Sequence, residues 1–219
     1  YVLGGKKPDG SKYIAPSDMI NLGFIGTGKQ GQELANEFLK TGEIKITAIS
    51  EVYKDKAALT IENIKKYYAE NTQADKFSEI LVYTDMRELL ARKDVDAVVI
   101  ATPDHWHAAA AVRAAEAGKD IYCEKPLAHT VKEGIAMVKA VKKYNRVLQT
   151  GSMQRSSPQF HKACELARNG YIGEIKQVLV SVGGPPIPCV LPTEPTPEYL
   201  NWNLWLGPAP ERGYHSELS

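Results

Sequence analysis

The stretch Ile20-Asn-Leu-Gly-Phe-Ile-Gly26-Thr-Gly28-Lys-Gln-Gly31 decides the fold. A short strand-like run leads directly into the pattern Gly-x-Gly-x-x-Gly, and an amphipathic stretch follows. In this pattern the first glycine permits a tight turn, the second lets a phosphate approach the backbone, and the third lets helix and strand pack closely. An ordinary glycine turn is the alternative. The candidate phosphate-binding residues are Gly26, Thr27, Gly28, Lys29, Gln30 and Gly31.

The rest of the chain up to about residue 150 repeats this alternation of short β-branched runs and longer amphipathic stretches. The patterns predict strands at 20–25, 44–50, 81–83, 97–101, 120–123 and 147–149. They predict helices at 30–40, 54–69, 86–92, 107–117 and 131–143. Because crossovers between parallel strands are almost always right-handed, we expect an α/β fold with a doubly wound parallel sheet.

A second, incomplete domain is expected after residue 150. A helix at about 158–169 and a strand at 174–182 precede a proline-dense, irregular tail, which cannot be a regular helix or a central strand. One helix and one strand are too few to bury the apolar face of that strand. We therefore predict a polar arm at 1–19, a dinucleotide-binding domain at 20–150, and the truncated beginning of an α+β substrate domain at 151–219.

The composition is that of an ordinary globular protein and excludes several function classes. The 219 residues include 27 Lys and Arg against 26 Asp and Glu, a formal charge of +1, so we expect no binding of nucleic acid. No apolar run approaches the roughly 18 residues of a membrane span. The three cysteines are widely spaced and form no pair suited to a metal.

Glu51 ends the second predicted strand, 20 positions beyond Gly31. An acid at this place can accept hydrogen bonds from the adenosine ribose hydroxyls, although a helix N-terminal charge is an alternative role. A carboxylate there would repel a 2′-phosphate, so NAD is favoured over NADP. Lys29 and Lys54 are close to these residues in sequence, so NADP remains the alternative cofactor.

The fourth predicted strand runs into Ala101-Thr-Pro-Asp-His-Trp-His107. We expect Thr102 and Pro103 beside a nicotinamide ring, Asp104 as the cap of the next helix, and Trp106 and His107 near the substrate mouth. Histidines two positions apart diverge on a helix and no third ligand is nearby, so no metal site is predicted.

The fifth predicted strand delivers Glu124-Lys125-Pro126 to the same carboxyl edge. Ligands of open α/β sheets bind at this edge, and Pro126 restricts Lys125 to extended geometry. A solvated surface lysine is the alternative. The sixth strand adds Gln154 and Arg155, which either reach a ligand or anchor the next helix.

Four ordered motifs together resemble the Gfo/Idh/MocA oxidoreductases, a family that includes glucose–fructose oxidoreductase and inositol 2-dehydrogenase. They are the glycine pattern, Ala-Thr-Pro-Asp-His-Trp-His, Glu-Lys-Pro and Tyr171-Ile-Gly-Glu-Ile175. The resemblance implies a Rossmann domain followed by a substrate domain built on an open sheet, which forms homo-oligomers. It implies that Lys125 hydrogen-bonds the substrate hydroxyl, that a His or Asp of the second domain completes the proton relay, and that the Lys–Pro bond is often cis. His107 is a second catalytic candidate because of its expected place near the substrate mouth. Besides the residues of the glycine pattern, the cofactor-binding candidates are Glu51, Thr102, Pro103, Glu124, Pro126 and Gln154.

Three functions fit these residues. The first is NAD-dependent hydride transfer to or from a secondary alcohol of a sugar or polyol. The second is a glycosidase or lyase that oxidises the sugar transiently. The third is a cofactor-binding fragment without activity, because the chain ends before the segment that carries the family's partner Asp and His. The opening arm resembles that of exported members, so a periplasmic location is expected, with the cytoplasm as the alternative.

Overall fold

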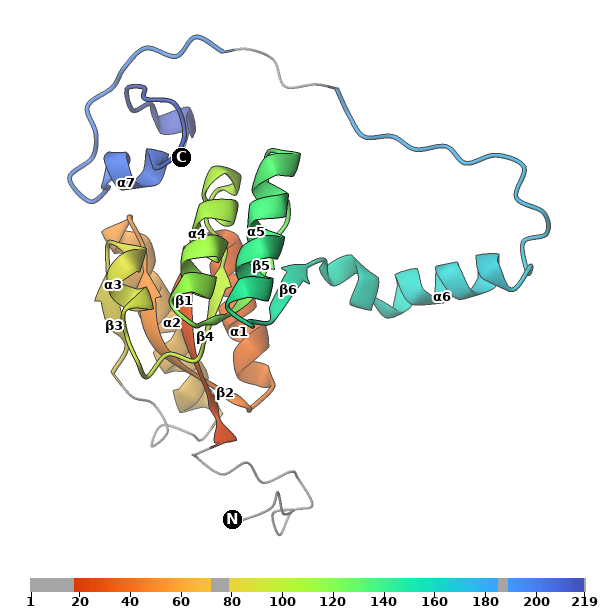
Figure 1. Cartoon of the computed structure of the whole chain (residues 1–219), viewed down its shortest axis with the longest axis horizontal. Helices are drawn as coiled ribbons and strands as arrows, with labels where there is room; N and C mark the ends of the chain where they lie inside the picture. The colour runs from red at the N-terminus through yellow and green to blue at the C-terminus, as the bar shows by residue number, and fades with distance from the viewer. Residues whose placement is uncertain (1–17, 72–78, 185–188, 219) are drawn as a thin grey trace. The chain divides into compact units, whose positions relative to one another are not determined.

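The structure of the chain is a computed structural model that describes residues 18–71, 79–184 and 189–218. Within these residues six strands form one sheet in the order β3-β2-β1-β4-β5-β6 (Figure 1). The neighbouring strands from β3 to β5 pair in parallel. The strands are β1 (Ile20–Ile25), β2 (Ile44–Ser50), β3 (Leu81–Tyr83), β4 (Ala97–Ile100), β5 (Asp120–Glu124) and β6 (Leu148–Gly151). The predicted doubly wound α/β fold is confirmed.

The strand order reverses at β1, which pairs with β2 on one side and with β4 on the other. Ile25, the last residue of β1, is level with Ser50 of β2 and with Ile100 of β4. The chain segments that follow these three strands therefore leave the sheet at one edge. In sheets of this kind a ligand binds at such a reversal, outside the carboxyl ends of the strands.

Helices flank both faces of the sheet (Figure 1). Phe24 and Ile49 face the helices α1 and α2, where Leu34 and Ile64 complete one buried cluster. On the other face Val98 and Ile100 of β4 pack with residues of α3, α4 and α5. The helices are α1 (Lys29–Lys40), α2 (Lys54–Glu70), α3 (Met86–Leu90), α4 (Asp104–Glu116), α5 (Val131–Lys143), α6 (Pro158–Arg168) and α7 (Trp202–Leu206). Because β4 alternates between two buried faces, its run of apolar residues is continuous.

Local signals explain where several helices begin. Thr130 and Glu133 form a capping box at the start of α5, in which each side chain accepts a hydrogen bond from the other residue's backbone. Asp85 caps α3 by accepting from the N–H of Arg87. The expected cap at Asp104 is wrong: Pro103 is the N-cap of α4, and Asp104 is already the first helical residue. Its carboxylate there still interacts favourably with the positive, N-terminal end of the helix dipole.

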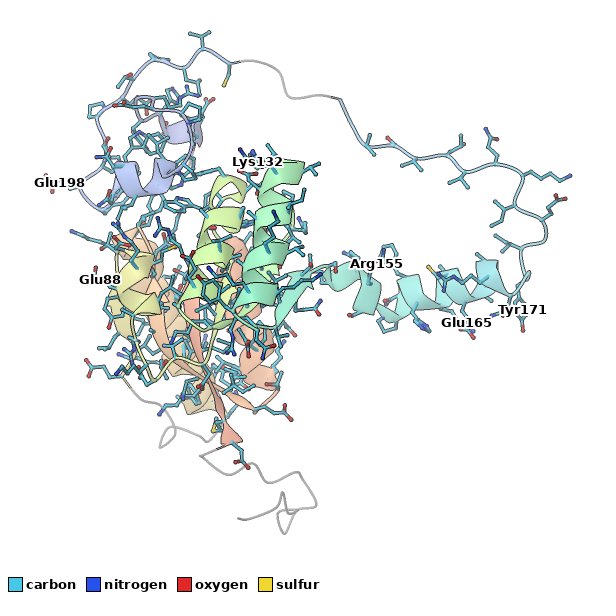
Figure 2. The ribbon with its side chains drawn as sticks, in the orientation of Figure 1. Glu88, Lys132, Arg155, Glu165, Tyr171 and Glu198 are labelled. Carbon is cyan, nitrogen blue, oxygen red and sulfur yellow. The ribbon has the colours of Figure 1, made fainter. Side chains whose placement is uncertain are left out.

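The chain divides into two compact units. The first comprises the described residues up to Thr150 together with Thr196–Glu211, and the second comprises those of Gly151–Pro195 and Arg212–Ser219. The second unit includes α6 and the short 3-10 helices η3 (Met153–Ser156) and η4 (Ser216–Leu218). Arg155, Glu165 and Tyr171 of this unit are exposed side chains (Figure 2). The substrate domain expected at 151–219 stays a prediction.

Two expectations for the C-terminal part are wrong. Residues 174–182 form no strand, since no neighbouring strand accepts their backbone hydrogen bonds among the described residues. The tail expected to be irregular contains α7, capped by Asn201, whose side chain accepts from the N–H of Leu204. The predicted polar arm at 1–19 lies almost wholly outside the described residues, so the periplasmic location that rests on it stays a prediction. Within the described ranges, no helix combines the length and apolar character needed to cross a membrane.

Candidate functional site

The glycine turn at 26–31 connects β1 to α1 and has one crowded side and one open side. A Cβ at Gly26, where φ is +86°, would lie 2.8 Å from backbone atoms of Ala101 and Thr102. A Cβ at Gly31 would lie 2.4 Å from the carbonyl oxygen of Gly26. Both positions therefore require glycine for the turn to pack against the end of β4. At Gly28 no described atom comes within 4 Å of the Cβ position, which leaves space for an anion at the start of α1.

Glu51 joins the end of β2 to this turn. Its side chain is buried, and its Oε2 accepts hydrogen bonds from the backbone N–H of Thr27 at 2.6 Å and from the Thr27 hydroxyl at 3.1 Å. Its Oε1 accepts from the backbone N–H groups of Val52 and Tyr53 at 2.8 and 3.1 Å. Four donors thus satisfy a buried charge, and they hold the glycine turn against the second strand.

Lys125 follows β5 and is exposed, whereas Glu124 before it is buried. The Glu124 carboxylate accepts from the side-chain amide of Gln30 at 3.1 Å and from the backbone N–H of Lys125 at 3.2 Å. Gln30 belongs to the first turn of α1, so this contact links the glycine turn to the lysine loop. The Lys125–Pro126 peptide bond is cis, as the resemblance implies.

The buried charge of Glu124 affects its neighbours on β5. Burial raises the pKa of the Cys123 thiol to about 12, and the nearby carboxylate adds to this shift. Burial and the same carboxylate also raise the pKa of Tyr122. Cys123 is therefore an inert, neutral side chain at this edge of the sheet.

His107 is a buried side chain of α4, and its expected place near the substrate mouth stays a prediction. The side chain is only 1% exposed, and its two ring nitrogens face the carbonyl oxygens of Thr102 and Pro126. The ring therefore connects the loop after β4 to the loop after β5. A catalytic role for His107 stays a prediction.

Thr102 and Pro103 stand where β4 meets α4, beside the glycine turn. The hydroxyl oxygen of Thr102 is buried, and no hydrogen-bond partner for it is found among the described residues. A buried polar atom without a hydrogen-bond partner costs free energy unless a ligand supplies the missing hydrogen bond. Together with the open space over Gly28, this hydroxyl fits a bound dinucleotide with its phosphates at the glycine turn and its nicotinamide at the end of β4.

Comparison with known proteins agrees with this geometry. The model of an oxidoreductase family with an NAD-binding Rossmann fold, GFO_IDH_MocA, matches residues 20–152. The chain belongs to the Gfo/Idh/MocA oxidoreductase family. NAD is accordingly its cofactor.

Relatives of this Gfo/Idh/MocA protein include both dehydrogenases and a glycosidase. An inositol 2-dehydrogenase/D-chiro-inositol 3-dehydrogenase of Shouchella clausii is 32% identical over 157 residues, which are 71% of this chain and 42% of that protein. An alpha-N-acetylgalactosaminidase of Shewanella oneidensis is 35% identical over 125 residues, which are 55% of this chain and 26% of that protein. The chain thus spans about two fifths of the length of the inositol dehydrogenase.

A solved structure shares the fold. The scyllo-inositol dehydrogenase from Lactobacillus casei with bound cofactor NAD(H) and scyllo-inositol matches with a TM-score of 0.57 at 23% identity. The match covers 71% of this chain and 43% of that chain.

Thr196–Glu211 returns to the Rossmann unit of this Gfo/Idh/MocA protein and covers Trp106. The Trp106 indole N–H donates to the carbonyl oxygens of Leu204 and Trp205 at 2.9 and 3.1 Å. A Cβ at Gly207 would lie 2.1 Å from the Trp106 ring, so only glycine fits there. The Trp106 ring is thus packed against this segment, and its expected place near the substrate mouth stays a prediction. Asn201 and Gly207, which flank α7 as its cap residues, were the sequence signal for this helix.

The same segment also contacts the residues that follow β2. Leu200 forms an antiparallel bridge with Tyr53, and the Asn201 N–H donates to the carbonyl oxygen of Val52 at 3.0 Å. The Tyr53 and Tyr199 rings lie 6.2 Å apart. These contacts involve Val52 and Tyr53, the two residues directly after Glu51, and no local pattern in the sequence indicated them.

The remaining candidates are exposed. Lys29 and Lys54 are the first residues of α1 and α2. Gln154 and Arg155 lie in η3, in the second unit, and their roles stay predictions. Among the described residues no group of three His, Cys, Asp or Glu side chains could hold a metal ion.

Proposed function

We propose that this protein transfers a hydride between NAD and a secondary alcohol of a sugar or polyol. One observation carries the proposal. Buried and part-buried hydrogen bonds connect all four loops at the carboxyl edge: Glu51 to the glycine turn, Gln30 to Glu124, and His107 to both Thr102 and Pro126. A dinucleotide along this edge would place its reactive end beside Lys125.

Each residue then has a distinct part. The N–H groups around Gly28 bind the pyrophosphate, and Glu51 accepts from the ribose hydroxyls. For this the rotatable Thr27 hydroxyl, 3.1 Å from Glu51 Oε2, gives way to a ribose hydroxyl. A bound NAD would supply the acceptor for the hydride of the alcohol carbon. Lys125, with a neutral amine, takes the hydroxyl proton, so that the carbonyl product, NADH and a lysine ammonium balance the reaction.

The inositol dehydrogenases among the relatives support a polyhydroxylated ring as substrate. The buried carboxylate of Glu51 supports NAD over NADP, because a 2′-phosphate would meet an existing negative charge. We also propose assembly into a homo-oligomer through the second unit, whose segment 174–182 exposes Val178, Leu179, Val180 and Val182. Light scattering of the purified protein tests that assembly.

The decisive experiment compares Lys125→Ala with the unchanged full-length protein. Reduction of NAD is followed by absorbance with myo-inositol, scyllo-inositol and glucose as alternative substrates, and NAD affinity is measured by calorimetry. We expect turnover to fall by about 10²–10⁴-fold while NAD affinity is retained. Unchanged turnover would exclude Lys125 as the acid–base group.

A glycosidase is the second candidate, favoured by the identity with the alpha-N-acetylgalactosaminidase. In that reaction NAD held by the same residues would supply the acceptor for the hydride of the sugar and would later return it, so NADH would not accumulate. Release of the aglycone from a nitrophenyl sugar without net NADH would favour it. NAD binding without either reaction, in the full-length protein, would leave the third alternative, a cofactor-binding module.

A further inference from the structure

His107 is a buried titratable side chain with an unusual pair of partners. Its Nδ1 lies 2.7 Å from the carbonyl oxygen of Pro126, and its Nε2 lies 2.8 Å from the carbonyl oxygen of Thr102. Both separations are those of N–H···O hydrogen bonds. A carbonyl oxygen has no proton to give, so in each contact the ring nitrogen must be the donor.

A neutral imidazole cannot make both contacts. It carries a proton on one nitrogen and a lone pair on the other, and that lone pair would face a carbonyl lone pair at hydrogen-bond distance. Choosing the other tautomer only moves the conflict to the second carbonyl. We propose that His107 is held as an imidazolium ion that donates one hydrogen bond to each of the two loops.

A buried cation also requires a nearby negative charge. Glu124, 3% exposed, lies two positions before Pro126 and provides one. The hydrogen-bond donors described for its carboxylate are the neutral Gln30 amide and the Lys125 backbone N–H. This buried carboxylate is the counter-charge that the inference requires, because charges interact more strongly in a buried layer than in water.

The other charged groups near His107 are more exposed. They are Asp104 and the half-buried His105 on its own helix, Lys125 on the adjoining loop, Arg87 and Glu88 on α3, and Lys132 and the half-buried Glu133 on α5. Glu88 and Lys132 are labelled surface side chains in Figure 2. Solvent and salt screen such charges, so the inference assigns the counter-charge to Glu124.

The imidazolium gives His107 a defined part in the proposed reaction, and this consequence rests on the proposed function. Thr102 belongs to the loop expected at the nicotinamide, and Pro126 follows Lys125 directly. A ring that donates to both carbonyls fixes the separation of these loops. His107 is then a positioning residue that sets where the Lys125 amine lies relative to the cofactor.

Nuclear magnetic resonance of protein labelled with ¹⁵N in its histidine rings tests the protonation state directly. At about pH 8 ordinary histidines are neutral. We expect one of the five histidines to show two protonated ring nitrogens with slowly exchanging protons, and His107→Gln to remove that signal. His105→Gln is the matched control, because the Nε2 of His105 faces one carbonyl, that of Trp205, and needs one proton.

A neutral ring signature for His107 at this pH would overturn the inference. If His107→Gln does not fold, the other four histidines are substituted one at a time. A doubly protonated ring signal that persists in all four variants must then come from His107. Neither result depends on turnover, so this test can fail or succeed independently of the Lys125→Ala experiment.

In the full-length protein, His107→Gln should lower kcat by about 10–100-fold with NAD affinity retained. An unchanged kcat would remove the positioning role.

Discussion

The residues of β5 and the segment 174–182 are both predicted to be strands from the sequence, yet only β5 is a strand. β5 lies between β4 and β6, and its Ile121 and Cys123 are buried. In the segment 174–182, Val178, Leu179 and Val180 are each more than 70% exposed, and the backbone is irregular. The difference shows that a strand depends on partners for its backbone and on a packed face for its side chains, more than on its own residues.

The largest expected effect compares two isoleucines, one from the sheet and one from the exposed segment. Ile100 in β4 is 0% exposed and Ile175 is 57% exposed. Ile100→Ala should lower the free energy of unfolding by about 2–5 kcal/mol, because it leaves a cavity between strand and helices. Ile175→Ala should change it by less than about 0.5 kcal/mol.

Urea denaturation of both variants measures this difference. An equally large loss in Ile175→Ala would mean that the segment 174–182 is packed in solution, against a second copy or another part of the protein.

A smaller loss is expected where a polar side chain, instead of apolar packing, holds the backbone. Glu51→Gln replaces one carboxylate oxygen by an NH₂ group, which must face either the Thr27 donors or the N–H groups of Val52 and Tyr53. We expect a loss of about 1.5–3 kcal/mol in stability and weaker NAD binding. Thr27→Ser keeps both donors and is the control. Equal stability and equal NAD affinity in Glu51→Gln would show that the carboxylate does not hold the turn.

Much of the first unit could be predicted because its signals are local. The glycine pattern, the continuous apolar run of β4 and the capping residues of α5 each constrain their own neighbourhood, and parallel pairing then brings the strand ends to one edge. The location of Glu51 beside the glycine turn followed from strand order alone.

The rest depends on contacts that no spacing encodes. His107 was expected at a substrate mouth, but its ring turns inward to two carbonyl groups 5 and 19 positions away. Trp106 is covered by residues 98 and 99 positions later in the chain. In 174–182, strong β propensity gave a wrong strand because propensity carries no information about whether a partner strand is present.

Thiol labelling sharpens the comparison of β5 with the second unit without changing stability. Cys123 in β5 is buried, whereas Cys164 and Cys189 of the second unit are exposed. With the pKa of Cys123 raised to about 12, roughly one thiol in 10⁴ is ionised at about pH 8. A disulfide reagent should therefore modify two thiols quickly and the third only after unfolding.

Variants identify the thiols in that experiment. Cys164→Ala and Cys189→Ala should each remove one fast thiol, and Cys123→Ala should leave both. Fast modification of Cys123 in the folded protein would show that β5 opens locally.

The smallest effect is expected in the second unit, where one half-buried carboxylate, that of Glu194, orders the last residues. Glu194 accepts from the Ser216 N–H at 2.9 Å and lies 3.2 Å from the His215 ring, and the backbone hydrogen bond from Ser216 holds the pKa of Glu194 below its usual value. A carboxyl with a lowered pKa contributes stability above its ordinary pKa of about 4.3, and this contribution is lost as the pH falls through the lowered value. Protection of the Ser216 amide from hydrogen exchange should accordingly decline below about pH 4, whereas in Glu194→Gln it should be weak and independent of pH in that range. Protection that persists in acid would mean that contacts other than the Glu194 charge order these residues. The second unit would then be packed more like β5 than the exposed side chains of its segment 174–182 indicate.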